Sequence, residues 1–304
     1  MTPDERGLQF KVMHTALRAV RCPLLVGRDD LLELADRRLE QVTAGRGQFL
    51  LLAGEAGIGK TRLLAAIRGK AEARGFSAVA GAVAPQDRDV PAASLLDLAR
   101  SMTRLPPFAD LGRELLDLSD ATRAAEHVQL RRLVMEFVER ILNSLPGPTM
   151  LSFEDLQWAD DVSLQVIAEL ARQSPDRQLL LIGDYRTEEV APDASLRDWR
   201  TRLITQRIAE EVRLAPLTET ETALVTTLIL DTGLPAPREV AAAVFERKDG
   251  IPLHIEELLG ALSAEARANG RAIREATVPD TIAVECPPDP AWSTSRCRSS
   301  RRPG

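Results

Sequence analysis

The chain has 304 residues, 44% of them hydrophobic, which suits one large domain or two smaller ones and excludes wholesale disorder. Lys and Arg number 39 against 45 Asp and Glu, and the resulting net charge of −6 argues against direct DNA binding. The three cysteines, Cys22, Cys286 and Cys297, cannot form a disulfide framework and lack the paired spacing of a zinc site. No apolar run approaches the ~18 residues of a membrane span. We therefore expect a cytoplasmic protein that makes no contact with a membrane.

Strands and helices alternate over the first two thirds of the chain. The run 49–53 is short and continuously apolar, which is typical of a strand buried on both faces of a parallel sheet. The alternation predicts an α/β domain over residues 22–215, with a parallel five-stranded sheet flanked by helices and a helical extension at 1–21. The remaining expected elements are helices at 29–42, 60–74, 161–173 and 195–210, a mainly helical region at 92–143 that is clearest at 123–143, and strands at 76–83, 149–153, 179–183 and 211–214.

After Pro216 the pattern changes to helices alone. We expect them at 219–231, at 237–248 and from Pro252, which stands at the favoured first position of a helix. Thr218 and Glu221 have the spacing of a capping box. The pattern predicts a small all-helical lid domain over 216–284 and a disordered tail, rich in Pro and Arg, over 285–304.

The strongest motif lies between the strand at 49–53 and the helix at 60–74. It has the form G-x-x-x-x-G-K-[ST], and this strand–loop–helix context is the one in which such a motif binds phosphate. Glycines let backbone N–H groups converge on phosphate oxygens, the lysine reaches the β- and γ-phosphates, and the threonine hydroxyl binds Mg²⁺. The sequence therefore predicts a P-loop NTPase that binds ATP and Mg²⁺. The loop residues are Gly54, Glu55, Ala56, Gly57, Ile58, Gly59, Lys60 and Thr61.

Two carboxylates end the strand at 149–153. We expect this strand to lie beside the phosphate-loop strand and to deliver Glu154 and Asp155 to the same edge of the sheet. Glu154 is assigned to the Mg²⁺ shell and Asp155 to the polarisation of the attacking water. The alternative is that Asp155 or Asp160 caps the helix at 161, and Asp160 has the position that favours this alternative.

Three further residues are weaker candidates. Arg186 follows the strand at 179–183, where a guanidinium could bind the γ-phosphate with two parallel bonds or pair with Glu188 or Glu189 on the surface. Taken by itself, the segment that contains Arg28 predicts only a turn and a cap at the start of the helix at 29–42. Pro252 indicates only the start of a helix.

Five segments together resemble the AAA-type module of the signal-transduction ATPases with numerous domains (STAND). Within that group, the similarity points to the large LuxR-type and MalT-like transcriptional regulators. It covers about residues 22–284. The segments are Leu25–Arg28, the loop Gly54–Thr61, Phe153–Asp160, Asp184–Arg186 and Gly250–Leu253.

The resemblance implies roles for the weaker candidates. Arg28 would lie near the adenine, Arg186 would sense the γ-phosphate, and Pro252 would contact the base. Asp184 stands where the family more often has a small or hydroxyl-bearing residue. Because such regulators continue into helical repeats and a helix-turn-helix, we expect this chain to be a truncated regulator that lacks its DNA-binding domain.

The favoured hypothesis is a nucleotide switch in which ATP and ADP select different positions of the lid and hydrolysis is slow. Self-association through the nucleotide-binding module is a further hypothesis about its partners. One alternative is a nucleic-acid-linked ATPase of the AAA+ type, similar to origin-recognition loaders. A second is the ATP-binding module of an adenylate cyclase or kinase-type signalling protein. A P-loop phosphotransferase and a protein that only binds nucleotide are further alternatives.

Overall fold

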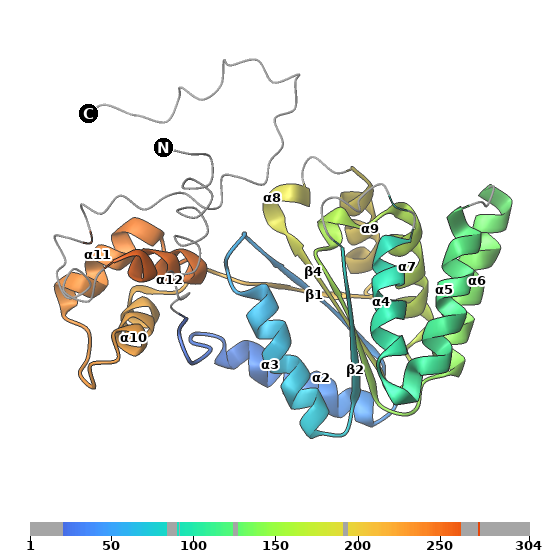
Figure 1. Ribbon diagram of the computed structural model, residues 1–304, viewed down its shortest axis with the longest axis horizontal. Helices are drawn as coiled ribbons and strands as arrows, with labels where there is room; N and C mark the ends of the chain where they lie inside the picture. Colours follow the sequence, from blue (N-terminus) through green and yellow to red (C-terminus); the bar gives the residue numbers. More distant parts are fainter. Residues whose placement is uncertain are drawn as a thin grey trace, which may run out of the picture.

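A computed structural model describes residues 21–83, 90, 92–123, 127–190, 194–262 and 273, with side chains given outside 119–130. The extension predicted at 1–21 lies outside the described residues except for Arg21, and the tail at 285–304 lies outside them entirely. Within the described chain, five strands and their flanking helices form one layered unit, and three helices form a separate group beside it (Figure 1).

The sheet is parallel throughout and has the strand order β2-β3-β4-β1-β5. β4 therefore lies between β3 and β1, and the expectation that β3 lies beside the phosphate-loop strand is wrong. Because every pairing is parallel, the carboxyl ends of all five strands still meet at one edge. The strands are β1 (Gln48–Gly54), β2 (Ser77–Ala82), β3 (Thr149–Glu154), β4 (Leu179–Arg186) and β5 (Glu210–Arg213).

Alternation along the strands explains the two layers of helices. In β1, Leu50 and Leu52 pack against one layer, whereas Phe49 and Leu51 belong to the core under the other. The first layer consists of α2 (Asp29–Thr43) and α3 (Lys60–Ala73). The second consists of α4 (Ala93–Thr103), α5 (Ala109–Arg123), α6 (His127–Asn143), α7 (Asp161–Gln173) and α9 (Ala194–Thr205) (Figure 1).

Two predicted boundaries are corrected. β4 continues to Arg186 because it stays paired with β1 as far as Gly54, so Arg186 ends the strand instead of following it. The helix expected at 195–210 is α9, which ends at Thr205, and it is preceded by the short α8 (Thr187–Val190). The region 92–143 is mainly helical over its described residues, as predicted, and a short 3₁₀ segment, Pro106–Phe108, separates α4 from α5, because its two prolines lack the N–H that a continuing helix needs. Residues 124–126, between the described ends of α5 and α6, lie outside the described residues.

Two predicted caps are confirmed. The Asp160 carboxylate accepts a hydrogen bond from the Val162 amide at 3.1 Å and caps α7. Thr218 and Glu221 form the complete capping box at the start of α10. Both motifs were predictable because all their partners lie within three residues in the sequence.

The helices α10 (Glu219–Leu230), α11 (Arg238–Lys248) and α12 (Pro252–Ala261) surround a core of their own. Val240, Val244, Ile255 and Leu259 are buried in it, and Cys22 from the start of the described chain joins them. The three helices therefore have a core separate from that of the sheet unit. Specific contacts join them to the sheet unit, and one of these contacts involves the phosphate loop.

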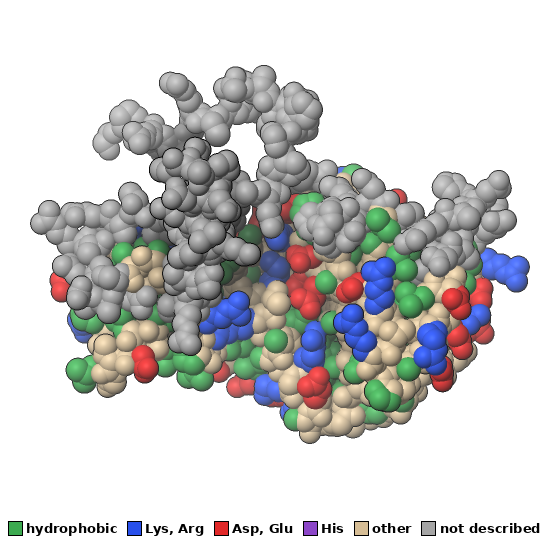
Figure 2. Space-filling view, viewed as in Figure 1, with side chains coloured by type: hydrophobic (Ala, Val, Ile, Leu, Met, Phe, Trp, Pro, Cys, Tyr) green, Lys and Arg blue, Asp and Glu red, His purple; other side chains and the backbone are tan. Residues whose placement is uncertain are grey.

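The surface carries charge of both signs. Figure 2 shows Lys and Arg interspersed with Asp and Glu on the visible face, without one continuous basic area. Among the described helices, none combines the length and the apolar character needed to cross a membrane.

Candidate functional site

The phosphate loop joins β1 to α3 at the carboxyl edge of the sheet. Gly57 and Gly59 have φ angles of 76° and 100°, a left-handed conformation that residues with a side chain rarely adopt. A Cβ atom on Gly57 would also lie 3.0 Å from the Cβ of Leu253 in α12. The loop therefore needs glycine here, and it places backbone amides beside the positive end of the α3 dipole.

Lys60 is held inside this loop. The residue is 7% exposed, and its ammonium donates to the backbone oxygens of Gly54 at 2.7 Å and Glu55 at 3.0 Å. Burial lowers the pKa of Lys60, and the nearby carboxylate of Asp184 acts in the opposite direction. A triphosphate would give this desolvated cation a charged partner that the neutral carbonyls do not supply. Thr61, next in α3, is exposed at the same edge.

The acidic pair lies at this edge, but its two members have different surroundings. Glu154 ends β3, and its Oε1 is 3.6 Å from Nη2 of Arg68 in α3. Burial raises the pKa of Glu154, while Arg68 opposes the shift. Asp155 has φ 57° and begins the 3₁₀ segment Leu156–Trp158. Its carboxylate accepts a hydrogen bond from the Gln157 amide group at 2.7 Å.

Of the two residues proposed as alternative caps, Asp160 alone caps α7. Asp155 makes no side-chain capping bond at the 3₁₀ segment, so the capping interpretation is wrong for this residue. Asp155 therefore keeps a carboxylate that is 42% exposed and faces the carboxyl edge of β4.

Asp184 lies near the end of β4 as expected, but its burial and its hydrogen bond to the turn after β3 were not predicted from the sequence. The residue is 2% exposed, and its Oδ1 accepts a hydrogen bond from the backbone amide of Asp155 at 2.7 Å. Burial raises the pKa of Asp184 to about 7. The residue thus fixes the turn after β3 from the neighbouring strand. Gln157 strengthens the same junction, because its Oε1 accepts from the Arg186 amide at 3.1 Å.

Arg186 lies between two acids. Its Nε is 3.9 Å from Oδ1 of Asp155, and its Nη1 is 3.8 Å from Oε1 of Glu189. The ion pair with Glu189, which the sequence offered as an alternative, is therefore present. The guanidinium of Arg186 also lies close to Asp155, the residue that the sequence analysis assigned to polarising the attacking water. Glu188 does not pair with Arg186 in this way: its Oε1 accepts a hydrogen bond from the Ala56 amide of the phosphate loop at 2.9 Å.

Arg28 and Pro252 lie at the junction with the helical group. Arg28 is 5% exposed, and its Nη2 donates to the backbone oxygens of Ile58 at 3.2 Å and Ala215 at 2.8 Å. Its pKa is lowered because of burial. The guanidinium thus joins the phosphate loop to the segment before α10, which is more than the turn expected from the sequence. Pro252 begins α12, and the next amide, of Leu253, donates to the Gly57 oxygen at 3.2 Å.

The donor atoms at this edge suit Mg²⁺. Among the described residues, no cluster of three or more His, Cys, Asp or Glu could hold a metal on its own. Mg²⁺ bound with a nucleotide needs no such cluster, since phosphate oxygens and waters fill most of its shell and one or two protein oxygens suffice. The Thr61 hydroxyl and the Glu154 carboxylate are oxygen donors of this kind.

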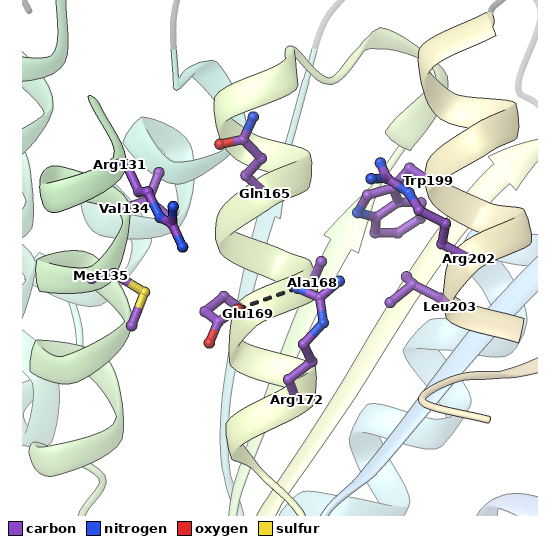
Figure 3. Close-up of a pocket in the computed structure, with 10 residues that line it drawn as sticks. All are labelled: Arg131, Val134, Met135, Gln165, Ala168, Glu169, Arg172, Trp199, Arg202 and Leu203. Atoms are coloured by element: carbon purple, nitrogen blue, oxygen red, sulfur yellow. Dashed lines mark hydrogen bonds and ion pairs between the residues drawn. The ribbon is translucent and has the colours of Figure 1, made fainter. Parts of the chain in front are cut away.

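A groove elsewhere on the molecule is separate from this site. It lies between α6, α7 and α9, with Arg131, Arg172 and Arg202 around a floor that includes Ala168 and Trp199 (Figure 3). None of its lining residues belongs to the phosphate loop, to the acidic turn after β3 or to the end of β4.

The fold and the loop geometry agree with a family match. Residues 24–182, more than half of the chain, match the model of the AAA ATPase domain. The chain belongs to the AAA ATPase domain family. Membership of this family implies nucleotide binding, and Mg²⁺ is the metal that such domains typically use.

Relatives and solved structures are more distant. The AAA ATPase chain is 24% identical over 295 residues to an uncharacterized protein of Rhizobium meliloti (strain 1021), covering 86% of this chain and 27% of that protein. It is similar in fold to the Aeropyrum pernix ORC1 protein in complex with DNA, with a TM-score of 0.53, 16% identity, and coverage of 84% of this chain and 65% of that chain. Drosophila ORC bound to DNA gives a TM-score of 0.54 and 12% identity, covering 86% and 63%. The likeness to the two solved structures shows the fold alone, and the chain spans about a quarter of the length of the Rhizobium protein.

Proposed function

We propose that this AAA ATPase module is a nucleotide switch that binds Mg·ATP and hydrolyses it slowly, within a transcriptional regulator of the LuxR type. The observation that carries the proposal is the contact of the phosphate loop with the helical group, through the Leu253 amide and the Gly57 oxygen. Nucleotide held by the loop would therefore be sensed directly by α12. We further propose that the sheet domain spans 22–215 and that the lid spans 216–284.

The proposed binding chemistry uses groups already aligned at the edge. The amides of the loop 54–61 bind phosphate oxygens, and Lys60 exchanges its carbonyl partners for a phosphate, a stronger charge-assisted contact. Mg²⁺, held by Thr61 and Glu154, would neutralise charge on the phosphates. Arg28 fixes the loop from behind, and Pro252 begins the helix that would meet the base.

Asp155 is the proposed group that accepts a proton from the attacking water. Hydrogen bonds from Gln157 to its carboxylate and from its own amide to Asp184 hold it in one orientation. Its side chain is one methylene shorter than glutamate, and a misplaced water-positioning group can cost about 10²-fold in rate. The turnover of ATP should therefore be slow. Arg186 would distinguish ATP from ADP, because only ATP offers it a γ-phosphate.

The site is tested by Lys60→Ala in a Mg·ATP titration followed by calorimetry. We expect this variant to lose measurable binding, because nothing else in the loop supplies its cation. Lys70→Ala is the matched control: Lys70 lies in the same helix but pairs with Asp36 at 2.9 Å, away from the loop. It should bind as the wild type does. Unchanged affinity in Lys60→Ala would refute the assignment.

The switch is tested by hydrogen exchange of α12 in the ATP- and ADP-bound wild type together with steady-state turnover. Different protection of α12 in the two states and turnover well below the order of 10 per second are expected. Fast turnover with equal protection would contradict a switch. Turnover stimulated by DNA would favour a nucleic-acid-linked ATPase instead.

A further inference from the structure

A carboxylate of the chain itself contacts the phosphate loop. The Ala56 amide, in the middle of the loop, donates to Oε1 of Glu188 at 2.9 Å, although the two residues are 132 positions apart. The second carboxylate oxygen, Oε2, accepts from the Thr187 hydroxyl at 3.3 Å. Glu188 is in this way oriented onto an amide that belongs to the anion-binding loop.

This contact competes with a phosphate for the same region. Loops of this kind bind anions because several backbone N–H groups converge on one place. The negative charge of Glu188 also acts to raise the pKa of Lys60, against the lowering by burial. A triphosphate held there would bring further negative charge beside Glu188, and like charges at such short range repel one another.

We propose that Glu188 is a built-in competitor of the nucleotide, and that binding of Mg·ATP expels its carboxylate from the phosphate loop and displaces α8. The inference rests on the proposed nucleotide site and concerns its regulation. α8 directly follows Arg186, which faces both Asp155 and Glu189. Expulsion of Glu188 therefore links occupancy of the loop to the guanidinium that would meet the γ-phosphate.

Glu188→Ala tests the competition by a gain of affinity, which damage to the fold would not produce. We expect the dissociation constant for Mg·ATP to fall about three- to tenfold, as befits the loss of one exposed charged competitor. Glu189→Ala is the matched control. It removes the same charge from the same short helix but leaves the Glu188–Ala56 contact in place, and Arg186 keeps Asp155 as a partner.

The outcomes distinguish a failure of the proposed competition by Glu188 from a failure of the proposed nucleotide site. Tightening in Glu188→Ala but not in Glu189→Ala supports competition. Equal tightening in both variants would assign the effect to general charge and overturn it, as would unchanged or weaker affinity in Glu188→Ala. Absence of ATP binding in the wild type and in both variants would instead refute the nucleotide site itself.

Discussion

At the scale of single residues, buried polar groups at the carboxyl edge decide how the site is held. Asp184 is the clearest case, because the residue is 2% exposed and its carboxylate accepts the hydrogen bond from the Asp155 amide that joins β4 to the turn after β3. Burial favours the neutral acid, and its pKa rises from 3.8 to about 7. The charge at this position is therefore costly above neutral pH.

This burial predicts how Asp184 affects stability. A raised pKa means that the folded chain binds the proton more tightly than the unfolded chain does, so the contribution is complete below pH 4 and is lost as the pH rises to about 7. Asp184→Asn keeps an oxygen for the Asp155 amide and cannot ionise. We expect it to be more stable than the wild type at pH 8, by on the order of 3 kcal/mol.

The measurement is the free energy of unfolding in urea at pH 4.5 and pH 8. The difference between Asp184→Asn and the wild type should shrink strongly at the lower pH. An equal difference at both values would contradict a buried acid with a raised pKa.

Local contacts were predictable from the sequence, and contacts between distant segments were not. The Asp160 cap and the Thr218 capping box depend on residues three positions apart or fewer. The bond from Asp155 to Asp184 spans 29 positions and that from Ala56 to Glu188 spans 132. Such pairs follow from the strand order, which short-range patterns do not determine.

At the scale of elements, the connection between α11 and α12 needs a glycine for two reasons. Gly250 has φ 73°, and a Cβ atom there would lie 2.1 Å from the Leu217 oxygen. The obstacle is backbone, and the Leu217 amide also donates to the Gly250 oxygen at 2.9 Å. The segment before α10 and the turn before α12 therefore cannot separate without breaking this hydrogen bond. The turn in this way fixes the start of α12, whose Leu253 amide contacts the phosphate loop.

Gly250→Ala should accordingly destabilise the chain by about 2 kcal/mol or more. Gly69→Ala is the control, because Gly69 lies in α3 with nothing within 4 Å of its added Cβ. That substitution should be neutral or stabilising by up to about 1 kcal/mol. Thermal unfolding of both variants checks the pair, and equal midpoints would contradict the close approach at Gly250.

At the scale of the whole molecule, the sheet unit and the helical group meet around the phosphate loop. Arg28 contacts Ile58 and Ala215, and the α12 amide of Leu253 contacts Gly57. The alternation of strands and helices predicted both units, but not the order that inserts β4 between β3 and β1. The prediction that β3 pairs with β1 was wrong, but Glu154 still lies at the same edge of the sheet as the phosphate loop. Parallel strands present all their carboxyl ends at one edge, whatever their order.

The most direct test of the account is a crystal structure of this chain with Mg²⁺ and a non-hydrolysable ATP analogue. The account predicts phosphates bound by the amides of the loop 54–61, with Lys60 released from the Gly54 oxygen and the metal contacted by Thr61 and Glu154. A nucleotide bound away from this loop, or a metal held by other side chains, would contradict it.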